Sequence, residues 1–497
     1  MSTSILQASA FTLQQRLTAG EITSVHLVKE FLNQIEKHNT NGMRLNAVIS
    51  ILDRDLALET AKRLDEERKY SRVRSGLHGI PIIIKDCIVT GPDLGMSTTV
   101  GSHVFGAMQG KQNAPLVNQL IENGVIILGK GNLTESCGLK SNDTPIGWSA
   151  YMGQTLSAHK MPHLSEKDQP TCGGSTSGPA TSIAAGFCSI GIGTETAGST
   201  VYPASCCGLY GMKLTPGSVS TKGVFKLSES FDSIGVLGTT PYDLALLTDA
   251  IVREAKPKPV SERLSSLTAR SWSDLGVGVV TNTWGVAHAI EKWCRPEVKI
   301  IYESVPHVLE SKGAKVIFPL NIPGGDILKV DEDNLGTVAY HEFPREIEEF
   351  LTNFDRTTSI NSLDDIIKWN EQNADISLPD PYKTQTELIK SRDNKMTEQR
   401  HNKVLSELRR IAINELEKSM ADGLDIVLAP SDSTMVSYAA CAGWPIATVP
   451  LGRLDSNGQP FGLFAIAREG SDDLLLNFMA LFEKAFPAPK RASCPFD

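Results

Sequence analysis

The amino-acid sequence predicts an α/β fold in which a central twisted, mixed β-sheet is covered by α-helices on both faces. Short apolar runs, such as the one in GIPIIIKD at 79–86, have the length of buried strands. They alternate with longer segments of helical period, of which residues 53–70 are an example. One apolar strand, at 188–192, leads directly into a turn of small residues. Strands that alternate with helices in this way are typical of α/β proteins.

The chain begins with a helical segment at 12–37, interrupted at Gly20, after which Thr23 or Ser24 can cap a new helix. The next helical segment, 53–70, carries acidic residues early and basic residues late, as the helix dipole favours. The further expected helices cover 179–186, 243–254, 296–312, most of 342–395, 396–420 and 471–486. The expected strands cover 45–51, 79–86, 125–128, 188–192, 277–280, 316–318, 426–429, 447–451 and 463–467.

Composition and charge exclude several classes of protein. With 41% hydrophobic and 21% charged residues, the 497-residue chain has an ordinary globular balance. Its net charge of −9 argues against nucleic acid as a partner. No apolar run reaches the roughly 18 residues of a membrane span, and the N-terminus lacks the pattern of a secretory signal. We expect a cytoplasmic protein, a monomer or homodimer, that acts on a small molecule.

The nine cysteines contain no CxxC pair, and no Cys/His cluster has the spacing of a metal site. We therefore expect reduced thiols, and neither a metal nor another cofactor. We predict one domain over residues 1–497, with four regions. They are a helical region at 1–72, a core with the main motifs at 73–255, a variable and mostly helical region at 256–425 that shapes the substrate pocket, and closing strands and a helix at 426–497.

Two tight turns of small residues stand close together in the sequence, GGSTSG at 173–178 and TETAGS at 194–199. The backbone N–H groups of such turns can point toward one ligand atom, and a serine beside them can act as a nucleophile. Ser175 and Ser199 are therefore candidate catalytic residues. A flexible linker would not alternate with apolar segments. A phosphate-binding loop would need a Lys-Ser/Thr pair where Pro179 follows the last glycine.

Lys85 ends the apolar strand at 79–86. Taken alone, this position favours a surface lysine whose ammonium group reaches water, because lysine is rarely buried. A desolvated lysine, however, loses its charge readily and can then act as a general base.

Motifs along nearly the whole chain resemble the amidase signature family. They are GIPIIIKD around Lys85, KGNLTE from Lys130, GWSAYMGQT from Gly147, GGSTSG around Ser175, TETAGS ending at Ser199, PASCCGLYGMKLTPG from Pro203, SFDSIGVLGTTPYDLALLTDAI from Ser230 and AGWPIATVPLG from Ala442. The second turn and the GWSAYMGQ loop are most similar to the branch of peptide amidases and fungal amidases. The resemblance overturns the surface interpretation of Lys85.

The resemblance implies an amide hydrolase with a Ser-cisSer-Lys triad, which cleaves a carboxamide through a covalent ester. Ser199 would attack the carbonyl, and its proton would pass through Ser175, preceded by a cis peptide bond in this family, to Lys85. The oxyanion would be received by the backbone N–H groups of Thr196, Ala197, Gly198 and Ser199.

The second turn departs from the common family pattern at three positions. Ala197 stands where a glycine is usual, which is tolerable only if its φ is negative. Glu195 replaces the common aspartate, and Val201 replaces an arginine, so the Asp–Arg support pair is absent.

Substrate choice depends on loops around the triad. The candidate substrate-binding residues are Trp148, Tyr151, Met152, Gly174 and Tyr202. The polar segment 342–395 lacks a long apolar face, so we expect a neutral, compact primary, aryl or peptidyl carboxamide that releases ammonia or an amine. An acyltransferase and a non-catalytic scaffold are the alternatives. A Ser-His-Asp triad would need a G-x-S-x-G turn, which neither serine has.

Overall fold

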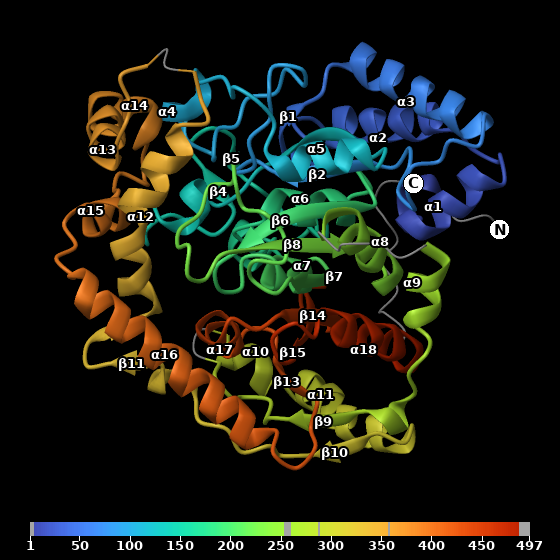
Figure 1. Cartoon of the computed structure of the whole chain (residues 1–497), viewed down its shortest axis with the longest axis vertical. Helices are drawn as coiled ribbons and strands as arrows, with labels where there is room; N and C mark the ends of the chain where they lie inside the picture. Colours follow the sequence, from blue (N-terminus) through green and yellow to red (C-terminus); the bar gives the residue numbers. More distant parts are fainter. Residues whose placement is uncertain (1–3, 253–259, 287–288, 356–357, 487–497) are drawn as a thin grey trace.

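The computed structural model describes residues 4–252, 260–286, 289–355 and 358–486 (Figure 1). At its centre lies an eleven-stranded sheet. The strands lie in the order β1 (Val48–Ile51), β3 (Ile126–Gly131), β2 (Pro81–Lys85), β6 (Ile190–Glu195), β8 (Ser233–Gly238), β7 (Tyr210–Lys213), β14 (Ile446–Arg453), β15 (Pro460–Ile466), β13 (Ile426–Pro430), β9 (Gly276–Val279) and β10 (Lys315–Ile317).

The sheet is mixed. Strand β2 runs parallel to β3 and β6, and β9 runs parallel to β10 and β13. The strands between these groups, from β6 through β8, β7, β14 and β15 to β13, pair antiparallel, and so do β1 and β3 at one edge. Because β14 pairs with β7, the C-terminal strands continue the sheet of the N-terminal half. The predicted α/β class with a mixed central sheet is confirmed.

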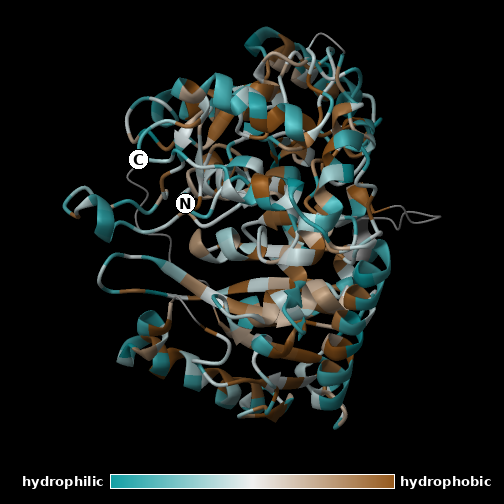
Figure 2. Cartoon of the chain, turned by 90° about the vertical axis from the view of Figure 1, so that its left-hand side faces the viewer, coloured by the Kyte–Doolittle hydropathy of each residue, from teal (hydrophilic) through white to brown (hydrophobic). Residues whose placement is uncertain are grey.

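The described helices cover both faces of this sheet or pack beside it. They are α1 (Ala10–Thr18), α2 (Ser24–His38), α3 (Arg54–Lys69), α4 (His103–Gly106), α5 (Pro115–Glu122), α6 (Ser177–Ala184), α7 (Val201–Cys206), α8 (Pro241–Ile251), α9 (Val260–Ser266), α10 (Ile290–Cys294), α11 (Pro296–Ser311), α12 (Leu335–Leu351), α13 (Leu363–Gln372), α14 (Ala374–Ser377), α15 (Thr386–Arg392), α16 (Glu398–Ser419), α17 (Met435–Ala442) and α18 (Asp472–Ala485). Helix α6 packs on β1, β2, β3 and β6, whereas α8 packs on β6, β7 and β8 and against α5 and α18. Figure 2 shows apolar strands inside and polar outer helices. Within the described ranges, no helix is long and apolar enough to cross a membrane.

Helices α12 to α16 form one side of the molecule, on the left of Figure 1. The expectation that this region lacks a long apolar face is wrong for α12. This helix begins at Leu335, before the expected start, and buries an apolar stripe that includes Phe343 and Phe350. Both rings pack edge-on against Phe225, with centroids 5.6 and 5.3 Å apart. The stripe faces the core, so it offers no exposed apolar surface.

The sequence did not predict β7 and β8. Each is short and contains glycine, which weakens the strand pattern, and their pairing with each other and with β6 and β14 defines them. The helix expected at 243–254 ends at Ile251, and residues 253–259 lie outside the described residues. The segment beyond them contains α9.

Candidate active site

The structure brings the two small-residue turns together. Strand β6 ends at Glu195 and runs directly into the second turn, while the first turn leads into α6. The N–H of Thr176 donates a 3.0 Å hydrogen bond to the carbonyl oxygen of Ser199, which joins the turns through the backbone. Ser175 is buried, whereas Ser199 is partly exposed, so Ser199 is the more accessible of the two serines.

Lys85 is fully buried at the end of β2, directly beside this pair of turns. Its Nζ donates to Ser175 Oγ at 2.8 Å, to Thr194 Oγ1 at 2.9 Å and to the Thr194 carbonyl at 3.2 Å. The peptide bond between Gly174 and Ser175 is cis. The parallel pairing of β2 with β6 explains the placement, because neighbouring parallel strands end at the same edge of a sheet.

The Glu195 carboxylate organises the second turn. It accepts hydrogen bonds from the N–H groups of Gly198 at 2.9 Å, Thr200 at 2.7 Å and Val201 at 3.0 Å. Glu195 therefore makes backbone contacts within the turn, where the family pattern has an Asp–Arg pair. Gly198 has φ 93°, a torsion that favours glycine. Ala197 is not among the residues of positive φ, as the sequence required.

One proposed oxyanion donor needs correction. The Gly198 N–H points to Glu195 and is already used, because a backbone amide has a single hydrogen to donate. The N–H groups of Thr196, Ala197 and Ser199 are the ones that we retain as oxyanion donors.

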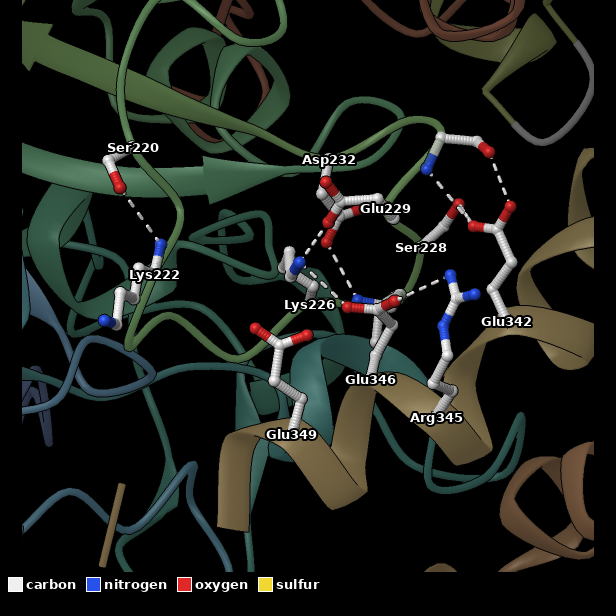
Figure 3. A network of polar contacts seen from close by, with 12 residues as sticks. Ser220, Lys222, Lys226, Ser228, Glu229, Asp232, Glu342, Arg345, Glu346 and Glu349 are labelled. Atoms are coloured by element: carbon white, nitrogen blue, oxygen red, sulfur yellow. Dashed lines mark hydrogen bonds and ion pairs between the residues drawn. The ribbon is translucent and has the colours of Figure 1, made fainter. Parts of the chain in front are cut away.

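Two buried charged residues that the sequence did not single out hold the second turn from behind. Lys213 Nζ donates to the Thr196 carbonyl at 2.7 Å, and burial lowers the pKa of this lysine. Asp232, which is labelled in Figure 3, accepts from Thr196 Oγ1 at 2.6 Å and from the N–H of Leu227 at 2.8 Å. Burial raises the pKa of Asp232 to about 6. Both residues lie within motifs that resemble the amidase signature family, Lys213 in the motif from Pro203 and Asp232 in the motif from Ser230. These motifs are the sequence signal that could have pointed to them.

Cys137 also lies near Lys85 and was not predicted. It is partly exposed and has φ 54°, outside the usual torsions of cysteine. A hydrogen bond with the buried Cys87 thiol lowers the pKa of Cys137 to about 7. The sequence carries no pattern that pairs these two cysteines.

The candidate substrate-binding residues have different surroundings. Trp148 packs edge-on against Tyr382, at 4.8 Å between centroids, and Tyr151 lies 5.0 Å from the His103 ring of α4. Met152 lines a hollow formed mainly by α2 and β1. These contacts explain the presence of Tyr151 and Met152 by packing, without a role in substrate binding.

Gly174 and Tyr202 lie in or beside the two turns. A Cβ atom at Gly174 would come within 2.6 Å of both Ile146 Cγ2 and Thr134 Oγ1, so no side chain fits there. Tyr202 is the second residue of α7, the helix that follows Ser199, and is half-buried among apolar side chains. Ile146, which is 51% exposed, is a further pocket candidate that the sequence did not suggest.

Comparisons with known proteins agree with this fold. The amidase family model matches residues 26–476. A probable amidase from Arabidopsis thaliana is 29% identical over 489 residues, which cover 97% of this chain and 90% of that protein. A mitochondrial glutamyl-tRNA(Gln) amidotransferase subunit from Homo sapiens is 26% identical over 529 residues, covering 95% and 93%. The peptide amidase structure from Stenotrophomonas maltophilia has a TM-score of 0.85 and 29% identity, covering 98% of this chain and 99% of that chain.

The fold and these matches define an amide-hydrolysing enzyme. The family match covers most of the chain, and the chain belongs to the amidase family, as the motifs predicted.

Proposed function

We propose that this chain hydrolyses a carboxamide through an acyl-enzyme on Ser199, with Ser175 and Lys85 as the proton relay. The observation that carries the proposal is the 2.8 Å distance between Lys85 Nζ and Ser175 Oγ. In the proposed state the two Lys85 N–H hydrogens point to Thr194, and the Nζ lone pair accepts from the Ser175 hydroxyl. Ser175 lies in the first turn, and the residue after it, Thr176, donates its N–H to the carbonyl oxygen of Ser199. The proposal assigns Lys85 as base, Ser175 as relay and Ser199 as the accessible hydroxyl, which together are what an activated serine requires.

In the proposed reaction, Ser199 Oγ attacks the carbonyl carbon and forms a C–O bond. Its proton passes to Ser175 Oγ, while Ser175 gives its own proton to neutral Lys85. Collapse of the tetrahedral intermediate breaks the C–N bond, and Lys85 returns the proton through Ser175 to the leaving ammonia or amine. Water then cleaves the ester by the same relay and releases the carboxylic acid.

The negative charge that develops on the carbonyl oxygen is assigned to the N–H groups of Thr196, Ala197 and Ser199. Each donor of this kind typically lowers the activation barrier by about 3 kcal/mol. Lys213 and Asp232 support the turn through Thr196 but do not reach the substrate in this proposal.

The proposed substrate is a neutral, compact primary, aryl or peptidyl carboxamide. Apolar side chains flank the turns, with Ile146 beside Gly174 and Val436 within 3.5 Å of a Cβ atom at Gly198. Asp432, an acidic group near Tyr202, is bound by Lys292 and by the Trp293 indole, so it is already neutralised. The likeness to a peptide amidase supports this class of substrate.

Rates on three substrates test the proposal: a short peptide amide, a benzamide-type aryl amide and a long-chain fatty amide, with product identified by mass spectrometry. We expect the first two to be preferred, because α12 buries its apolar face in the core and leaves no exposed apolar stripe for a long acyl chain. A clear preference for the fatty amide would contradict the proposed pocket.

Acyl transfer is the second candidate, favoured by the 26% identity to a component of an amidotransferase. Both reactions share the acyl-enzyme and differ in whether an amine or water accepts the acyl group. Hydroxylamine added during turnover separates them: a hydrolase yields mainly acid, whereas an acyltransferase yields mainly hydroxamate at low hydroxylamine concentration.

A further inference from the structure

Three side chains of types that can bind a metal meet on the helical side of the molecule, apart from the proposed triad. They are His341 on α12 and Glu398 and His401 on α16. One ligand atom from each residue lies within 4.8 Å of the others. The two imidazole rings are stacked with centroids 4.8 Å apart, and His341 Nε2 lies 3.2 Å from Glu398 Oε1.

Helix geometry explains the cluster. Glu398 and His401 are three residues apart in the first turn of α16, so they project from the same face of that helix. Helix α12 packs against α16 and adds His341 from the other side. Side-chain exposure rises from 10% for His401 through 17% for His341 to 78% for Glu398. The cluster is therefore closed on the protein side and open to solvent at Glu398.

His401 provides an independent observation that points to a ligand. Its Nε2 lies 2.7 Å from Glu342 Oε1, whereas its Nδ1 is buried without any hydrogen-bond partner. A buried polar atom without a partner typically costs about 1–3 kcal/mol. The Glu342 contact favours the tautomer with hydrogen on Nε2, which leaves a lone pair on Nδ1.

Glu342 is in turn fixed by its own hydrogen bonds (Figure 3). Its carboxylate accepts from the Ser228 hydroxyl, from Ser230 Oγ at 2.5 Å and from the Ser230 N–H at 3.2 Å. A carboxylate that holds the second nitrogen of a histidine is the usual support of a histidine that binds a metal.

We propose that His341, Glu398 and His401 bind a divalent transition-metal ion of the Zn²⁺ type, with His401 Nδ1 as a ligand and Glu342 as its supporting carboxylate. Two imidazoles and one carboxylate form a ligand set that suits such ions, and the exposed side leaves room for water as a further ligand. The ion would join α12 to α16. Through Glu342 it would also brace the loop from Ser228 to Asp232, whose last residue binds Thr196 of the second turn.

Ordinary surface His–Glu pairs of this chain look different. His26 lies 3.9 Å from Glu30, and His307 lies 3.7 Å from Glu310, but all four side chains are at least 42% exposed. Neither pair belongs to a group of three candidate ligands among the described residues. These pairs supply matched controls.

Metal binding by the full-length chain, purified without a histidine tag and stripped of metal, tests the proposal. Calorimetric titration and equilibrium dialysis with metal analysis should give one tightly bound Zn²⁺ per chain. Co²⁺ should give the visible absorption of a nitrogen- and oxygen-ligated ion without a thiolate charge-transfer band, which separates this site from the cysteines.

Variants locate the ion. His341→Gln and His401→Gln should each weaken binding at least about tenfold, and Glu342→Gln should weaken it by about tenfold as a supporting residue. His307→Gln, from an exposed pair, and Cys294→Ser, at an exposed cysteine, should bind as the natural chain does. If His401→Gln does not fold, His341→Gln decides, because it lies near the surface. Binding well below one Zn²⁺ per chain, or unchanged affinity in His341→Gln, would overturn the proposal.

Discussion

The proposed triad and the histidine cluster are built in different ways. Lys85, Ser175 and Ser199 stand at a strand end and in turns beside it, so sheet pairing and backbone hydrogen bonds set their positions. His341 and His401 project from two helices and meet only because α12 packs against α16. A site made by strand ends and turns leaves motifs of small residues in the sequence. A site made by the packing of two helices leaves little more than polar residues.

The two sites are connected by the loop between Ser228 and Asp232. Ser228 and Ser230 bind Glu342 on the helical side, and Asp232 binds Thr196 on the side of the second turn. We therefore expect substitutions of the proposed triad to lower the catalytic rate. Substitutions of the residues that support the second turn should lower the stability of the protein and disturb the position of the turn.

The largest effect is expected at the proposed nucleophile. Ser199→Ala should lower kcat by at least about a thousandfold and abolish labelling by a fluorophosphonate probe, because the attacking oxygen is lost. The circular dichroism spectrum and Tm should stay unchanged, since Ser199 is partly exposed on a turn. Ser175→Ala should also lose most activity through the broken relay. Near-full turnover of Ser199→Ala would show that Ser199 is not the nucleophile. The turns at the strand ends would then not be the site of the chemistry.

A smaller effect is expected at Glu195, which holds the second turn but touches no substrate in the proposal. Glu195→Gln keeps one oxygen for three N–H donors, so it should lower the free energy of unfolding by about 3 kcal/mol and slow probe labelling. Urea unfolding measures the first effect. Glu21→Gln is the control, because Glu21 is 60% exposed in its ion pair with Arg16 and its replacement should change stability by less than about 0.5 kcal/mol. Equal losses in the two variants would show that the Glu195 contacts do not organise the turn.

The smallest effect concerns pH and Asp232. Its pKa is about 6 in the folded protein and 3.8 as the ordinary value, so the folded state binds this proton more strongly. The resulting stabilisation is complete below pH 3.8 and is lost as pH rises through about 6. Stability of the natural chain relative to Asp232→Asn should therefore fall by about 2 kcal/mol between these pH values and then level off. Denaturant unfolding at several pH values measures the difference, and a difference that is independent of pH would contradict the buried, protonatable state of Asp232.

Sequence patterns located most elements but not all of their limits. The strand expected at 188–192 lies at Ile190–Glu195, and the helix expected at 396–420 lies at Glu398–Ser419, because period and capping residues mark such segments. Strands β7 and β8 escaped notice, since glycine interrupts their apolar pattern and only pairing stabilises them. The apolar face of α12 was underestimated because the segment was begun at Glu342, within the helix.

By itself the sequence determined the α/β class, the family and the three residues proposed for the reaction. Those features depend on local patterns: apolar strands, small-residue turns and the residues that follow them. Only the tertiary structure decided that Gly198 gives its N–H to Glu195, and that Lys213 and Asp232 support the turn. It also decided that His341 meets His401 across two helices. The physical reason is that these contacts join side chains distant in sequence, and their partners are set by packing and burial rather than by any local period.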